Sequence, residues 1–202
     1  MEKQEQERLV EATQWAHLWH QSQSRKGTKI PYVSHLLQVQ GLVLEHGGNA
    51  DQAIAALLHD GLEDAPTADE RAVREREIGE RFGSAVLEIV GDCTDTLAHE
   101  FLDEKGCWKE RKTRYIERLA GASRRTQLVA ACDKRHNLHA IVWDVEIHGP
   151  EVFERFTGSP DQQIWYFSSI IEKLGDRIPR RLARELEELL ARLRHLVDAL
   201  DS

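Results

Sequence analysis

The sequence predicts an all-α fold, and three observations support this. Apolar residues recur at three- and four-residue spacing in nearly every segment between the glycine and proline breakers. The strict alternation typical of strands is weak throughout. Hydrophobic residues make up 41% and charged residues 31% of the 202, with only 13 Gly and 5 Pro, as in a helix-rich globular protein. This length suits one domain spanning residues 1–202.

The amino-terminal half predicts helices separated by clear breakers. The first covers residues 4–21 with an apolar stripe on one face, and a polar loop follows over residues 21–30. Pro31 starts the second helix, which stops at Gly47. The third, over residues 51–59, contains AIAALL and is apolar nearly all round. We therefore expect it at the centre of the bundle.

The remaining chain continues the helical pattern to its end. Residues 97–106 are the expected flexible loop, and Gly149 with Pro150 marks a break before a closing pair of helices. The last helix is strongly amphipathic and is predicted to pack with one face in solvent. The helices expected in this part cover residues 68–82, 84–93, 109–119, 126–148, 161–174 and 179–200.

Charge and segment composition exclude several classes of function. The formal net charge of −8 argues against nucleic acid or an anionic membrane surface as a partner. The start, MEKQEQERLV, lacks the apolar stretch of a secretory signal, and no apolar run approaches the length of a membrane span. We expect a cytoplasmic protein with Cys93, Cys107 and Cys132 reduced, and their spacing fits no zinc motif.

Two histidines and two aspartates form a candidate metal site. His59 and Asp60 end the apolar AIAALL helix, where a carboxylate is expected to be buried and to need a cation or a dense hydrogen-bond shell. His35 in PYVSH and Asp133 in ACDKRHNL are weak signals alone. Two imidazoles and two carboxylates suit Mn, Fe, Zn or a similar divalent ion and leave positions open for water and substrate.

Glu63 and Asp64 follow this histidine and aspartate pair closely. A continuing helical turn would place at least one of them on the same side as the metal ligands. A carboxylate there can orient water, take its proton and pass one to a leaving group. The alternative is a solvated acidic turn that starts the next helix.

The chain resembles the HD-domain phosphohydrolases, and more narrowly the hydrolase domain of the Rel/SpoT alarmone enzymes and the stand-alone small alarmone hydrolases. The resemblance covers residues of about 8–175. It implies an HD-domain helical bundle with a central metal site. Four stretches carry it: RKGTKIPYVSH, AALLHDGLED, IGERFGSAVLEIVGDCTD and ACDKRHNL.

The resemblance also implies roles for individual residues. It assigns a divalent metal, typically Mn²⁺, to His35, His59, Asp60 and Asp133. Glu63 and Asp64 become the catalytic acidic pair, and the substrate-binding residues become Arg25, Lys26 and Asn137. The reaction implied is attack of water that releases pyrophosphate from the ribose 3′ position of a small nucleotide.

The leading hypothesis is a hydrolase of guanosine 3′,5′-polyphosphates, (p)ppGpp, and by extension of the adenosine analogues, (p)ppApp. The alternatives are an HD nucleotidase or phosphodiesterase acting on another nucleotide, and a non-catalytic nucleotide sensor. Base preference, the metal used and the oligomeric state are left open by the sequence.

Several further side chains have two interpretations. The basic cluster on the 109–119 helix either binds phosphates or is a solvated helix face, and the latter is favoured. The aromatic run either stacks on a base or packs in the core, and the core is favoured. Surplus histidines near Asp133 are interpreted as non-ligands. The basic cluster consists of Lys109, Arg111, Lys112 and Arg114, the aromatic run of Trp165, Tyr166 and Phe167, and the surplus histidines of His136, His139 and His148.

Overall fold

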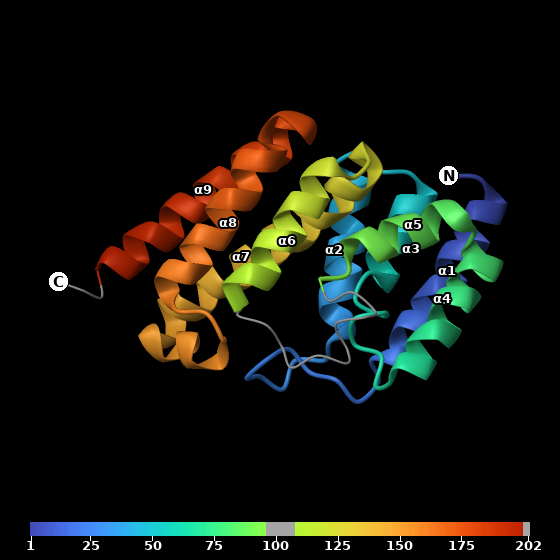
Figure 1. The fold of residues 1–202 in the computed structure, drawn as a ribbon, viewed down its shortest axis with the longest axis horizontal. Coiled ribbons are helices and arrows are strands. Elements are labelled where there is room, and N and C mark those ends of the chain that lie inside the picture. The colour runs from blue at the N-terminus through green and yellow to red at the C-terminus, as the bar shows by residue number, and fades with distance from the viewer. Residues whose placement is uncertain (96–107, 200–202) are drawn as a thin grey trace.

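The computed structural model describes residues 1–95 and 108–199, and within them the predicted all-α fold is confirmed. Figure 1 shows the helices arranged around α2 and α3. The loop predicted over residues 97–106 and Cys107 lie outside the described residues. The helices are α1 (Lys3–Trp19), α2 (Val33–Glu45), α3 (Ala50–Leu58), α4 (Ala68–Phe82), α5 (Ser84–Cys93), α6 (Trp108–Gly121), α7 (Arg124–His148), α8 (Pro160–Leu174) and α9 (Arg180–Asp198).

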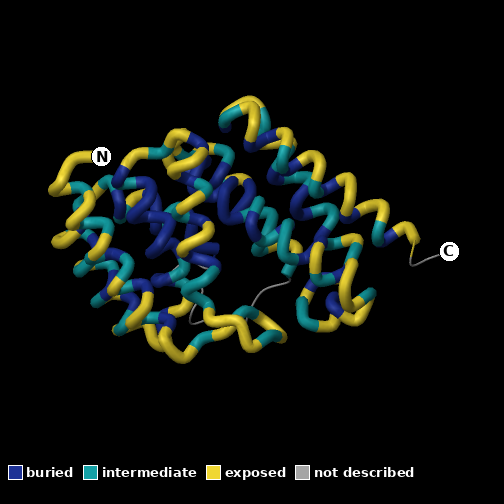
Figure 2. Tube along the Cα trace, turned by 180° about the vertical axis from the view of Figure 1, so that it is seen from behind, coloured by how far each residue is buried: buried dark blue, intermediate teal, exposed yellow. Residues whose placement is uncertain are grey.

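The helix α3 forms the centre of the bundle, as its composition predicts. Eight of its nine residues are buried, and it packs against α1, α2, α5 and α7. Asn49 begins it with a capping box, in which the Asn49 side chain accepts from the Gln52 backbone and the Gln52 side chain accepts from the Asn49 backbone. Figure 2 shows this buried interior surrounded by half-exposed outer helices.

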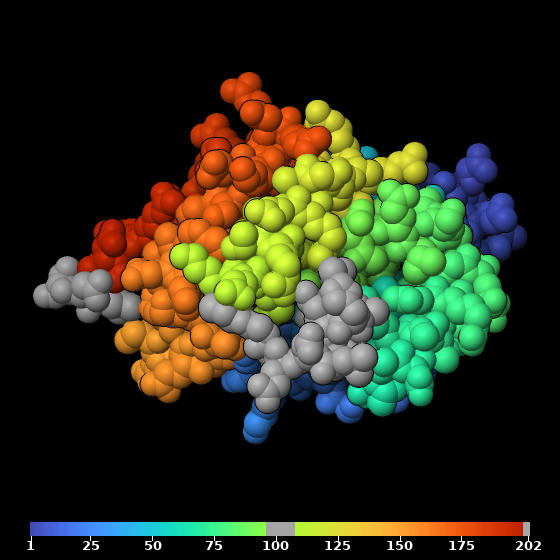
Figure 3. Space-filling model, viewed as in Figure 1, coloured from blue at the N-terminus to red at the C-terminus, as the bar shows by residue number. Residues whose placement is uncertain are grey.

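The long helix α7 joins the two sides of the molecule. It packs against α2, α3 and α5 on one side and against α8 and α9 on the other. The helix α9 presents an apolar stripe that includes Leu182, Leu186 and Leu193 to this layer, which agrees with the predicted packing helix. Figure 3 shows α6 at the surface between α8 and α5.

Most helix boundaries differ from the sequence prediction by one or two residues, and three of the differences have a clear local cause. The helix α2 begins at Val33, because residues 23–32 form a closed loop joined by a bridge between Ser24 and Pro31. The helix α7 begins at Arg124, where Ser123 caps it by accepting from the Thr126 backbone. The predicted break at Gly149 continues as a short 3₁₀ helix, Pro150–Arg155. Among the described residues, no helix is long and apolar enough to cross a membrane.

Candidate metal centre and acid pair

Three buried side chains from different helices meet at the centre of the bundle. His35 lies in the first turn of α2, His59 follows the last residue of α3, and Asp133 lies in α7. The Asp133 Oδ1 lies 3.2 Å from His35 Nε2 and 3.6 Å from His59 Nε2. One ligand atom from each of the three lies within 4.8 Å of the others, a spacing that suits a metal ion. Sequence spacing alone could not place them together.

Asp60 lies beside this group and touches both histidines. Its Oδ2 is 3.0 Å from His59 Nε2 and 3.6 Å from His35 Nε2. The Tyr32 hydroxyl donates to the same oxygen at 2.6 Å. Burial together with the Asp60 charge raises the pKa of Tyr32, so the phenol keeps its proton and remains a donor. Asp60 is partly exposed, with 21% of its side chain accessible, rather than fully buried as expected.

The proton arrangement of the histidines shows why a cation fits here. His59 Nδ1 lies 2.8 Å from the Ala56 carbonyl, which can only accept, so Nδ1 carries the proton. Nε2 is therefore the ring nitrogen that faces the carboxylate oxygens of Asp60 and Asp133, where it can carry a second proton or bind a cation. His59 Nε2 and His35 Nε2 are both buried without a hydrogen-bond partner in the described part of the chain. Two buried ring nitrogens that face carboxylate oxygens therefore share one place where a positive charge, a proton or a metal ion, is stabilised.

His136 orients His35 from the far side of the ring. The two Nδ1 atoms lie 2.8 Å apart. Burial and the neighbouring His35 and Arg25 lower the pKa of His136 to about 3, so its ring is neutral. A neutral His136 can accept the His35 Nδ1 proton, which leaves His35 Nε2 free as a ligand. His136 lies outside the three-residue metal group, and its orienting contact with His35 has no signal in the sequence.

Lys134 balances part of the negative charge of the site. Its ammonium donates to Asp133 Oδ2 at 2.6 Å and lies over the Tyr115 ring. Burial opposes ionisation of Asp133, but Lys134 and the two histidines outweigh it and lower the pKa of Asp133. Burial likewise opposes protonation of His59, and the charge of Asp60 overcomes this and raises its pKa. The lowered pKa of Asp133 reflects the neighbouring ammonium and histidines, whereas the raised pKa of His59 reflects the neighbouring carboxylates.

The acidic pair lies next to the group, in two different environments. Glu63 is held by the Asp95 backbone N–H, which donates to Glu63 Oε2 at 3.0 Å. Burial, then Asp95 and Asp60, raise the pKa of Glu63. Asp64 accepts from Gln23 Nε2 at 2.8 Å, and burial together with Asp60 raises its pKa. Glu63 is therefore not the solvated turn considered as the alternative, whereas Asp64 is exposed.

A tightly packed turn positions His59, Asp60 and the acidic pair. At Gly61, an added Cβ would lie 2.7 Å from the Trp19 ring, so only glycine fits this approach. Arg74 donates to the Gly61 carbonyl at 2.7 Å and its guanidinium lies over the Trp19 ring. Helices α1 and α4 thus fix the chain between the metal group and the acids.

Of the three expected substrate residues, the structure connects two to the metal group. Arg25 Nη2 donates to Asn137 Oδ1 at 2.8 Å, and Asn137 Nδ2 donates to Asp133 Oδ1 at 2.6 Å. Lys26, next in the loop, is exposed to solvent. Gly27 has φ +72°, a left-handed conformation, and packs directly against the Arg155 side chain.

The interpretation of the basic cluster as a solvated helix face is wrong for two of its members. Arg111 and Lys112 both pair with the Asp95 carboxylate, with Lys112 Nζ at 2.7 Å, and are only 21% and 17% exposed. Lys112 also lies over the Tyr166 ring. They are half-buried because α6 turns this face toward Asp95 and α8 rather than to water. The sequence could not show this contact across the chain.

The expectation that the aromatic run packs in the core is confirmed. Tyr166 and Phe167 are buried in the core, and Trp165 packs against it. His139 bonds to Trp143 Nε1, away from the metal group. Cys93 and Cys132 are buried thiols, and burial raises the pKa of each.

Comparison with known families agrees with the fold and with this centre. A sequence model described as HD domain matches residues 12–159. The chain belongs to the HD domain family, and the resemblance derived from the four motifs is confirmed.

Individual relatives are more specific. The Xenopus tropicalis protein named guanosine-3′,5′-bis(diphosphate) 3′-pyrophosphohydrolase MESH1 is 36% identical over 133 residues, which cover 64% of this chain and 67% of that protein. The Aquifex aeolicus guanosine-3′,5′-bis(diphosphate) 3′-pyrophosphohydrolase is 41% identical over 88 residues, covering 44% of this chain but 12% of that protein. A solved structure titled as a metazoan ortholog of SpoT that hydrolyses ppGpp has TM-score 0.67 and 26% identity, covering 91% of this chain and 94% of that one.

Proposed function

We propose that this chain is a metal-dependent hydrolase that removes the 3′-pyrophosphate from guanosine 3′,5′-polyphosphates. One observation carries the proposal: buried His35, His59 and Asp133 converge beside Asp60 with two ring nitrogens directed at carboxylate oxygens. The names of the relatives support the choice of substrate. Location in the cytoplasm remains a prediction from the sequence.

The proposed metal ligands are His35, His59, Asp60 and Asp133, and the proposed ion is Mn²⁺. The donor set supports this, because imidazole nitrogen with carboxylate oxygen suits a divalent ion of intermediate hardness. When bound, such an ion lowers the pKa of a water and offsets charge on phosphate oxygens. His136 and Tyr32 hold His35 and Asp60 in place by the hydrogen bonds that they make behind them.

Glu63 and Asp64 are proposed to move the protons of the reaction. Water attacks the phosphorus bonded to the ribose 3′ oxygen, the phosphorus–oxygen bond breaks, and the 3′ oxygen takes a proton. A carboxylate accepts the proton from the water, and a carboxyl returns one to the leaving oxygen. Raised pKa values suit both tasks, because such groups exchange protons closer to neutral pH.

Arg25, Lys26 and Asn137 are proposed to bind the nucleotide. The Arg25 guanidinium is held by Asn137 and lies over the Tyr32 ring, 5.8 Å from its centroid. From there it can receive phosphate oxygens or stack on a base. The closed loop of residues 23–32 holds it there, with Arg25 N donating to the Ile30 carbonyl at 2.8 Å.

The test is to incubate purified protein and Mn²⁺ with guanosine 3′,5′-bis(diphosphate), and separately with its adenosine analogue, and to resolve products by ion-exchange chromatography. We expect pyrophosphate and the nucleoside 5′-diphosphate from the guanosine substrate. The matched variants are Glu63→Gln, expected to lose turnover, and Glu80→Gln on the exposed face of α4, expected to keep it. Inorganic phosphate as the sole product, or no product at all, would contradict the proposal.

A further inference from the structure

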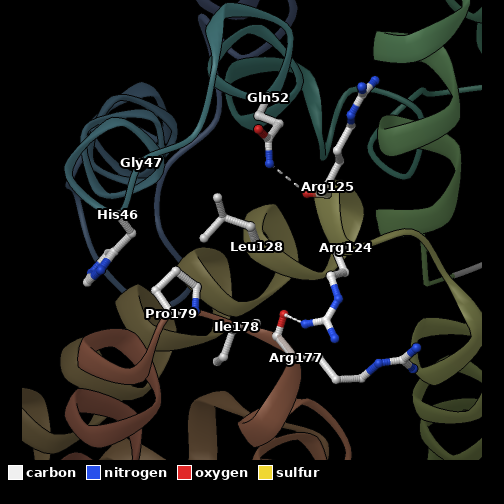
Figure 4. A pocket seen from close by; sticks show the side chains of 9 residues that line it. All are labelled: His46, Gly47, Gln52, Arg124, Arg125, Leu128, Arg177, Ile178 and Pro179. Carbon is white, nitrogen blue, oxygen red and sulfur yellow. Dashed lines mark hydrogen bonds between the residues drawn. The ribbon is translucent and has the colours of Figure 1, made fainter.

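A second concave site lies at the other ends of the helices that carry the metal group. Its volume is about 440 Å³. Along α2, α3 and α7 it is roughly 10 to 16 Å from the proposed ligands, at about 1.5 Å per residue. Figure 4 shows its walls, which the proposed function does not use. It is lined by His46, Gly47, Gln52, Arg124, Arg125, Leu128, Arg177, Ile178 and Pro179.

Two guanidinium groups lie along one edge of this pocket. Arg124 Nη1 donates to the Arg177 carbonyl at 3.0 Å, and Arg177 Nη1 donates to the Ala120 carbonyl. These carbonyl contacts hold each side chain without neutralising it, and in Figure 4 the Arg177 side chain extends outward from the point where Arg124 meets its backbone. Neither forms an ion pair within residues 1–95 and 108–199, in a protein whose net charge is −8. Figure 4 shows Arg125 turned away, with only its backbone carbonyl facing Gln52.

Helix ends add positive potential at the same place. Gln52 lies in the first turn of α3, Arg124 starts α7, and Pro179 precedes the first residue of α9. The amino-terminal end of a helix carries partial positive charge and normally attracts acidic residues. The helices α7 and α9 instead begin with pairs of arginine, at residues 124–125 and 180–181. Arginines at a helix start add positive charge to an end that is already positive, and this unfavourable arrangement is expected where a bound anion compensates for it.

We propose that this pocket binds a diphosphate group, either as free pyrophosphate or on a nucleoside. Guanidinium forks match the geometry of phosphate oxygens, and the converging helix ends favour the same charge. Leu128, Ile178 and Pro179 form an apolar wall opposite the arginines, on which a nucleoside can pack. The proposal does not depend on the hydrolase activity.

Binding is measured by isothermal titration calorimetry of the full chain with EDTA, using inorganic pyrophosphate and ADP as probes. Without metal, the carboxylates of the other site repel both probes. We expect saturable binding that weakens with salt and falls at least about tenfold in Arg124→Gln/Arg177→Gln, because the double variant loses both charged hydrogen-bond donors. Arg76→Gln, an exposed position on α4, should bind as wild type. Tighter binding of ADP than of pyrophosphate would identify a nucleotide as the ligand. Equal affinities for the two probes would identify free diphosphate.

A second measurement needs no substitution. Phenylglyoxal modifies accessible arginines, and mass spectrometry maps the sites. Pyrophosphate should slow modification of Arg124 and Arg177 in the wild-type protein and leave Arg76 unchanged. The proposal is overturned if neither probe binds saturably, if the double variant folds and binds as wild type, or if no protection appears at these two arginines.

Discussion

Replacing Lys134 with Met should show how much the charge of Lys134 contributes to the stability of the fold. The Lys134 ammonium bonds to Asp133 Oδ2 at 2.6 Å, and the two side chains are 13% and 6% exposed. Methionine keeps most of the stem that packs near Tyr115 and Tyr166 but removes the charge. The Asp133 carboxylate then remains buried with less compensation. Breaking such a pair from one side is strongly destabilising.

The expected magnitude follows from this burial. Removing one partner of a fully buried pair costs about 3 to 5 kcal/mol. Asp133 keeps the hydrogen bond from Asn137, so the lower end of this range, about 3 kcal/mol of unfolding free energy, is expected. For a chain of this size, that loss lowers the Tm by roughly 6 to 12 °C.

The assay is thermal and urea unfolding of wild type and Lys134→Met, each in EDTA and in saturating Mn²⁺. A cation bound beside Asp133 compensates for the charge that Lys134 no longer supplies, so Mn²⁺ should stabilise the variant more than the wild type. Lys173→Met on the exposed face of α8 is the matched control and should change the Tm little. A loss in EDTA no larger than that of the control, or equal metal stabilisation in both proteins, would refute this reasoning.

Three more predictions concern activity. Glu63→Gln and Asp64→Asn should each lower kcat by about 10² to 10⁴-fold, with Mn²⁺ affinity, measured by calorimetry, retained. Gly27→Ala should raise KM with little change in kcat. The φ of +72° at Gly27 and its contact with Arg155 strain any side chain placed there. Steady-state kinetics measures both constants, and a lowered kcat would mean that the loop also takes part in the chemical step. Asp95→Asn removes a negative charge that raises the pKa of Glu63, so its base form appears at lower pH, and the acidic limb of the kcat/KM profile should move to lower pH. An unmoved limb would mean that Glu63 is not the titrating base.

The fold and the position of His59 and Asp60 were predictable because their causes are local, whereas His35 and Asp133 were singled out only by the resemblance to a family. Apolar residues on every side of α3 require a central position, and a histidine and aspartate pair at its end is then carried inside. Contacts that orient those residues are not local. His136 meets His35 across 101 positions of sequence, and the packing of α2 against α7 decides that contact. A sequence pattern shows which residue types are present, but not the rotation of one helix against another.

Boundary errors had a related cause. The first turn of α7 contains two arginines, which a helix start normally avoids, so the sequence favoured a later beginning. Ser123 nevertheless caps the helix there, and its hydroxyl also contacts the Thr126 side chain at 3.1 Å. The position of Arg111 and Lys112 was missed because their partner, Asp95, lies in the chain following α5. Only the packing of α5 against α6 brings the three together.

The charge of the centre makes substrate binding conditional on a cation. Asp60, Asp133, Glu63 and Asp64 lie close together, and Lys134 is the buried ammonium that directly pairs with one of them. A pyrophosphate group approaching these carboxylates meets net repulsion, which is strong in a partly buried site. Burial and the neighbouring carboxylates raise the pKa of Glu63 and of Asp64, which shows the same repulsion acting within the site. A divalent ion relieves this repulsion, so the carboxylates that are proposed to hold the metal also make an anionic substrate depend on it.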